Sequence, residues 1–107
     1  MQTPLADWPA GLCREIAAIE TASIMACLGQ RLTFEKDRDD LDAFSAAIFT
    51  IDDTRFALQL YDRVPTGNFT LIVSDDAFDD QARLNTFLNW SGVPESAVVW
   101  RLLEGRE

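Results

Sequence analysis

The chain has 107 residues, which suffices for one hydrophobic core but not for two, so we expect a single domain over residues 1–107. Because 48% of the residues are apolar, burial can offset the entropy of folding, which argues against a disordered acidic tail. Eighteen acidic residues against nine basic ones give a formal charge of −9, and this charge argues against direct binding to nucleic acid or to anionic membranes.

The first predicted element is an amphipathic helix over about residues 10–28. Pro9 suits a first helical turn, and apolar residues recur at helical spacing from Leu12 onward. Gly29 is of the residue type that commonly ends a helix in the left-handed conformation. The pattern therefore predicts that the chain opens with a helix.

Both cysteines, Cys13 and Cys27, fall within this predicted helix. Their separation of fourteen residues corresponds to about 21 Å along a helix axis, whereas a disulfide needs Cα atoms within about 7 Å. Cysteines that do not pair favour a reducing compartment. The N-terminal stretch "MQTPLADWPAG" has no basic segment and no long apolar run, so a cytoplasmic protein is expected.

Alternating apolar residues then predict a meander of three antiparallel strands. The segments "AFSAAIFTI" (43–51) and "RFALQLY" (55–61) flank the tight turn "DDT", and "FTLIVS" (69–74) follows a short loop. A short strand is also expected within "QRLTFEK" (30–36), and the charged "DRDDLD" that follows is typical of a loop.

The acidic run "SDDAFDDQA" (74–82) leads into a second predicted helix, which ends at Gly92. The polar side chains at 74–76 can cap its first amide groups, and the carboxylates at 79–80 would lie in the first turn, where the helix dipole favours negative charge. Most of this acidic run is therefore explained without a ligand.

The C-terminal stretch "VPESAVVWRLLEGRE" fits either a strand or a helix, and the adjacent Val98, Val99 and Trp100 favour a strand. The predicted fold class is α+β. It consists of an N-terminal helix, an antiparallel sheet of three to five strands that contains the meander, and a second helix packed on the sheet.

Metal and cofactor motifs are weak in this sequence. The chain has no histidine, and the segment from Asp37 lacks the central glycine and final glutamate of an EF-hand loop. Asp76 and Asp80 would face each other on the second predicted helix, but two carboxylates make at most a weak magnesium contact. We therefore expect no cofactor and no functional metal.

Catalytic motifs are equally weak. The sequence has no glycine-rich phosphate loop and no nucleophile elbow, and without histidine it has no Ser-His or Cys-His pair. Paired carboxylates could serve a hydrolytic reaction, so a small carboxylate-dependent enzyme is an alternative to a non-catalytic protein.

Acidic residues gather at predicted loops and strand ends. In a meander, the 52–53 turn and the 75–80 segment fall at the same end of the sheet, and we include the 39–42 segment at the start of the first meander strand. We call the aspartates of these segments the acidic rim and predict that they bind the partner. The acidic rim comprises Asp39, Asp40, Asp42, Asp52, Asp53, Asp75, Asp76, Asp79 and Asp80.

The run "LTFEKDRDDLDAFSAAIFTIDDTRFALQLYDRVPTGNFTLIVSD", preceded by a predicted amphipathic helix, resembles the class I type III secretion chaperones of bacteria. The resemblance covers Leu12 to about Ser74 and is one of element order, size and acidity, with "IDD" as the short match. It implies a cytoplasmic homodimer that holds a secreted effector segment over exposed apolar grooves. Phe44, Phe49 and Phe56 could supply such grooves.

The predicted function is a non-catalytic acidic protein-binding module. A chaperone of this kind would bind an effector through apolar grooves. An immunity protein or a nucleic-acid-mimic inhibitor would instead bind a basic partner surface through its carboxylates, as a monomer and with strong dependence on salt. Salt dependence therefore distinguishes the two hypotheses.

Overall fold

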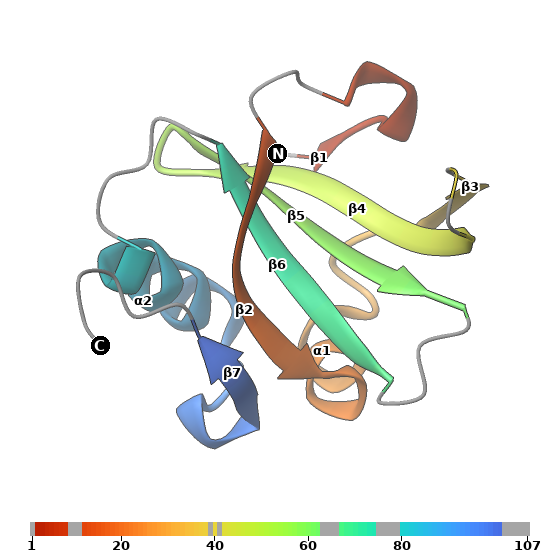
Figure 1. Ribbon diagram of the computed structural model, residues 1–107. Helices are drawn as coiled ribbons and strands as arrows, with labels where there is room; N and C mark the ends of the chain where they lie inside the picture. Colours follow the sequence, from red (N-terminus) through yellow and green to blue (C-terminus); the bar gives the residue numbers. More distant parts are fainter. Residues whose placement is uncertain are drawn as a thin grey trace.

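The computed structural model of the chain describes residues 2–8, 12–38, 40, 42–62, 67–74 and 80–101. Within these residues, seven strands form one antiparallel sheet, and two α-helices pack on one of its faces (Figure 1). The elements in chain order are β1 (Gln2–Thr3), η1 (Leu5–Asp7), β2 (Leu12–Glu20), α1 (Thr21–Leu28), β3 (Glu35–Arg38), β4 (Ala43–Ile51), β5 (Thr54–Tyr61), β6 (Asn68–Ser74), α2 (Asp80–Ser91), η2 (Glu95–Ala97) and β7 (Val98–Arg101).

The strand order is β1-β4-β5-β6-β2-β7, and β3 also pairs with β4. β1 pairs with the second half of β4 and β3 with its first half, so these two short strands share one edge of the sheet. β7 pairs with β2 at the opposite edge (Figure 1). The meander expected from residue alternation is present as β4, β5 and β6.

The prediction of an N-terminal helix over 10–28 is wrong. Residues Leu12–Glu20 form β2, a strand paired on both sides, and the first α-helix begins only at Thr21. Two register shifts in the pairing of β2 with β6 interrupt strict alternation, so that Ile16, Ala17 and Ile19 all reach the same core. This irregular spacing imitates a helical period, and it explains the wrong interpretation.

The predicted sheet of three to five strands is also wrong, because seven strands pair within the described residues. The additional strands are β1, which was not expected, and β2, which replaces half of the predicted helix. At the other end of the chain Val98–Arg101 forms β7, as its valines and tryptophan favour. Residues 102–107 lie outside the described part of the chain.

Two details of the predicted helices need correction. Gly29 follows α1 with φ −57°, a right-handed conformation, and a Cβ atom there would lie 2.5 Å from the carbonyl oxygen of Met25. Gly29 is thus required by a close approach and not by a left-handed cap. The helical spacing of the cysteines also fails because Cys13 lies in β2, while Cys27 in α1 is a free thiol.

The sheet buries side chains on both faces. Both helices cover one face, which we call the helix face, where Phe49, Phe56 and Phe87 pack together. The N-terminal segment covers part of the other face, which we call the open face, through Leu5 and Trp8. The rest of the open face is more polar than the helix face.

Candidate functional site

The structure divides the acidic rim into residues of different surroundings. Asp40, Asp52 and Asp53 are exposed. Asp42 is 9% exposed, and Asp80 is 2% exposed. Asp39, Asp75, Asp76 and Asp79 lie outside the described residues.

The described part of the rim occupies two ends of the sheet. Asp40 and Asp42 precede β4, whereas Asp52 and Asp53 follow it. A nine-residue strand separates these two groups by about 30 Å. Ser74 at the end of β6 lies at the same end as the 52–53 turn, because Val73 pairs with Phe56. The partner-binding role of the rim residues stays a prediction.

Asp80 has a structural partner. Its Oδ2 atom lies 2.9 Å from the Nη2 atom of Arg14 in β2, and its side chain is 1% exposed. The other oxygen, Oδ1, is buried without a hydrogen-bond partner. Asp80 therefore holds the start of α2 against the sheet and offers no exposed carboxylate to a partner. The sequence carried no signal for this pair, because its two residues are 66 positions apart and Arg14 was expected in a helix.

Asp52 and Asp53 form the two-residue turn that joins β4 to β5. Their φ angles are +49° and +66°, and Ile51 pairs with Thr54 across the turn, which is the geometry of a type I′ hairpin. Both side chains are exposed and make no hydrogen bond or ion pair with any described residue. The turn thus carries two adjacent negative charges, and its backbone geometry does not depend on either of them.

A hollow of about 360 Å³ lies beside this turn and is open to solvent. It is formed where the end of β4 meets the last turns of α2. The residues that line it are Ile51, Asp52, Thr86, Asn89 and Trp90.

Trp90 is held in place from two directions. Its ring stacks on Phe49, with centroids 5.3 Å apart and planes inclined by 15°, and the Arg31 guanidinium carbon lies 4.2 Å from the ring centroid. Arg31 also donates hydrogen bonds to the main-chain carbonyl oxygens of Trp90 and Ser91. Arg31 thus occupies carbonyl groups at the C-terminal end of α2, where the helix dipole favours a cation.

The groups around the hollow suit a cationic side chain. Asp52 offers a free carboxylate, and Thr86 and Asn89 offer neutral oxygen acceptors. Within the described residues, no three His, Cys, Asp or Glu side chains gather in a way that could hold a metal ion. The arrangement supports binding of a lysine or arginine side chain.

Sequence reasoning identified the turn but not the hollow. The turn follows from "IDDT" between two alternating runs. Thr86 and Asn89 are ordinary polar residues on a helix, and only the packing of α2 over the end of β4 brings them beside Asp52.

The phenylalanines expected to line apolar grooves are buried. Phe49 and Phe56 are fully covered in the helix-face core, and Phe44 lies in the smaller core of the open face. These three side chains therefore do not supply exposed grooves.

Comparison with protein-family models, with curated proteins and with solved structures finds no match. Among the helices of the described residues, none has the length and apolar character needed to cross a membrane.

Proposed function

We propose that the protein is a non-catalytic acidic binding module whose Asp52–Asp53 turn contacts a basic surface of a protein partner. The observation that carries the proposal is the turn itself, where two exposed carboxylates without partners stand on a short hairpin. A two-residue turn fixes its backbone closely, so little conformational freedom is lost when a partner binds. The chain's net charge of −9 steers a cationic partner towards it.

The hollow beside the turn supports recognition of a single cationic side chain. A lysine or arginine of the partner would reach past Asp52 towards Thr86 and Asn89. Removing the amide of Asn89 with Asn89→Ala should therefore weaken binding without affecting the turn. Contacts within the hollow would select a partner by the position of its cationic side chain, in addition to the long-range attraction between the net charges.

A carboxylate-based interface is favoured over an apolar-groove chaperone. The side chains named for the grooves are buried, whereas the Asp52 and Asp53 carboxylates are exposed. We therefore propose a role like that of immunity proteins and of inhibitors of basic partners. We also propose a cytoplasmic location, which the free thiol of Cys27 supports.

An NMR titration with a nine-residue oligoarginine peptide tests the proposal. Amide shifts should concentrate at 51–54 and at Thr86, Asn89 and the indole of Trp90. The affinity should fall steeply between about 0.05 M and about 0.5 M salt, because the contacting charges are exposed.

The matched variants are Asp52→Asn with Asp53→Asn, and Asp37→Asn with Asp40→Asn. Both pairs change the net charge equally, but Asp37 and Asp40 lie at the other end of β4. The first pair should remove the shifts at the turn, and the second should leave them in place. Shifts spread evenly over the surface, or equal effects of both pairs, would show that the turn is no specific site.

A further inference from the structure

The edge strand β7 exposes apolar side chains. Val99 is 57% exposed and Trp100 49% exposed, and these adjacent residues are two of the three exposed large apolar side chains of the described chain. β7 pairs with β2 on one side, and no strand of the described residues pairs with its other side (Figure 1). An exposed edge of this kind, with apolar side chains and no pairing strand, is a site where another strand can add.

Trp100 lies on the open face. It pairs with Ala18 of β2, and Ala18 pairs in turn with Thr70 of β6, so the indole stands beside a row of small side chains. Such small neighbours leave the face of the ring accessible. Val99 is the extra residue of an irregularity in the β2–β7 pairing, and this irregularity turns its side chain outward.

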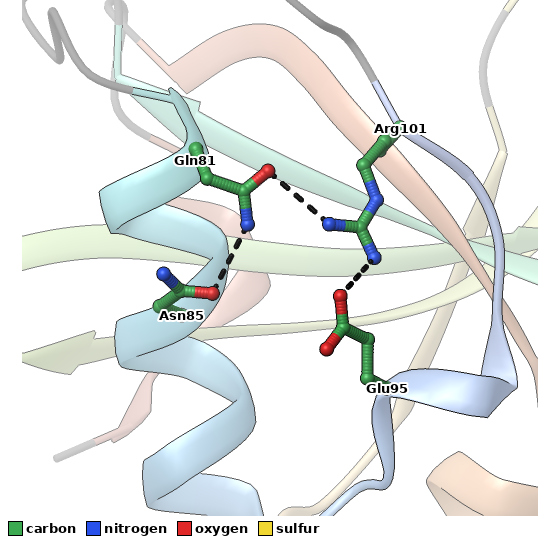
Figure 2. Close-up of polar contacts among 4 residues, drawn as sticks. All are labelled: Gln81, Asn85, Glu95 and Arg101. Atoms are coloured by element: carbon green, nitrogen blue, oxygen red, sulfur yellow. Dashed lines mark hydrogen bonds and ion pairs between the residues drawn. The ribbon is translucent and has the colours of Figure 1, made fainter.

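β7 is anchored from the helix face. The guanidinium of Arg101 donates to Gln81 of α2 at 3.2 Å and to Glu95 of η2 at 2.9 Å. Figure 2 shows how these side chains lie. Gln81 in turn donates to Asn85 one helical turn further on. These contacts hold the strand against α2 and leave Trp100 and Val99 for contacts on the other side.

The surroundings of Trp100 are acidic. Glu15 and Glu20 of β2 are exposed and, by their pairing with Ile72 and Asn68, lie on the same face as Trp100. The Glu15 side chain makes no hydrogen bond or ion pair with any described residue. A second copy of this chain would bring the same glutamates and its own charge of −9 to the edge, whereas a cationic segment would be attracted.

We infer that β7 and the adjoining open face form a second binding surface, which takes an extended peptide segment bearing lysine or arginine. The segment pairs its backbone with the outer side of β7 and places a cationic side chain over the Trp100 ring, between Glu15 and Glu20. This surface goes beyond the proposed function, because it is separate from the 52–53 turn and does not depend on it.

The test uses a soluble peptide in which lysines alternate with valines, and a matched peptide with glutamates in place of the lysines. NMR should show shifts of the Val99 and Trp100 amides and of the Trp100 indole with the lysine peptide alone, together with slower hydrogen exchange at β7. Trp100→Ala should weaken the affinity by about tenfold. Glu15→Gln with Glu20→Gln should weaken it by about fivefold. Because the three side chains are at least partly exposed, all variants should retain the wild-type circular dichroism spectrum.

The Asp52→Asn, Asp53→Asn variant separates the two surfaces, and the affinity measured from the Val99 and Trp100 shifts should change by less than about twofold, because the 52–53 turn is far from β7 in the sheet. If that variant loses binding while Trp100→Ala binds as the wild-type protein does, the β7 surface would be overturned and the turn supported. Equal binding of the glutamate peptide would also overturn it. If sedimentation reveals a dimer that Trp100→Ala abolishes, the occupant of this surface is a second copy of the chain, and the proposal of a cationic segment would be overturned.

Discussion

Asp52 and Asp53 adopt a backbone conformation that glycine and asparagine adopt at lower cost. Positive φ angles at both positions strain ordinary L-residues, and the adjacent charges repel each other. Glycine or asparagine at these positions would make the protein more stable. We therefore expect that the two aspartates are present for binding and not for stability.

Asp53→Gly should raise the free energy of unfolding by about 0.5–1 kcal/mol, because it removes both the left-handed strain and one charge. Asp53→Asn also removes the charge but relieves less of the left-handed strain than glycine does, so it should stabilise less. Urea denaturation measures both values. A Gly variant that is less stable than the Asn variant would contradict strain at this position.

The Arg14–Asp80 pair should behave asymmetrically, because the Asp80 side chain is 1% exposed and that of Arg14 is 30% exposed. Arg14→Met leaves a buried carboxylate without its cation and should cost about 3 kcal/mol. Asp80→Asn leaves the more exposed cation and should cost about 1–2 kcal/mol.

The double variant Arg14→Met, Asp80→Asn supplies the control for this pair. The loss of unfolding free energy in the double variant should be smaller, by at least about 1 kcal/mol, than the sum of the losses in the two single variants. The reason is that the two groups interact directly. Strict additivity in urea denaturation would show that the pair contributes nothing as a pair.

At the scale of elements, the sequence indicated the strands whose alternation is unbroken. In β5, Phe56, Leu58 and Leu60 all face the helix-face core, and the strand is bounded by a recognisable turn. β2 could not be identified in this way, because its register shifts place Ile16 and Ala17 on the same side. Deciding between helix and strand there required the pairing partners β6 and β7, which no local pattern reveals.

Ala18→Thr tests the assignment of β2. Threonine favours a strand and would lie beside Thr70 on the open face, so the free energy of unfolding should rise by about 0.5 kcal/mol. In a helix the same change would lower it by about as much. Thermal or urea denaturation gives the sign, and a destabilised variant would contradict the strand environment.

Gly92 ends α2 with φ +82°. A Cβ atom at this position would meet no atom within 4 Å, so any cost of substitution arises from the backbone. Gly92→Ala should cost about 1 kcal/mol, and Gly92→Asn should cost less because asparagine tolerates this conformation. Equal stability of the alanine variant and the wild-type protein would contradict the left-handed cap.

At the scale of the whole molecule, composition indicated an acidic protein but not where its carboxylates are available. Asp80 forms an ion pair with Arg14, and Asp62 forms one with Lys36. The Asp52 and Asp53 side chains have no partner among the described residues. This distribution depends on contacts between residues far apart in the sequence. For that reason the turn could be proposed from sequence, but its distinction from the other acidic segments could not.

Calorimetric titration with the oligoarginine peptide decides whether the Asp52–Asp53 turn is the binding site, by comparing two variants of equal net charge. If the turn is the binding site, Asp52→Asn with Asp53→Asn should raise the Kd by about tenfold, and Asp37→Asn with Asp40→Asn by less than about threefold. The same Kd for both variants would contradict the claim, because binding would then follow total charge and not the geometry of the turn.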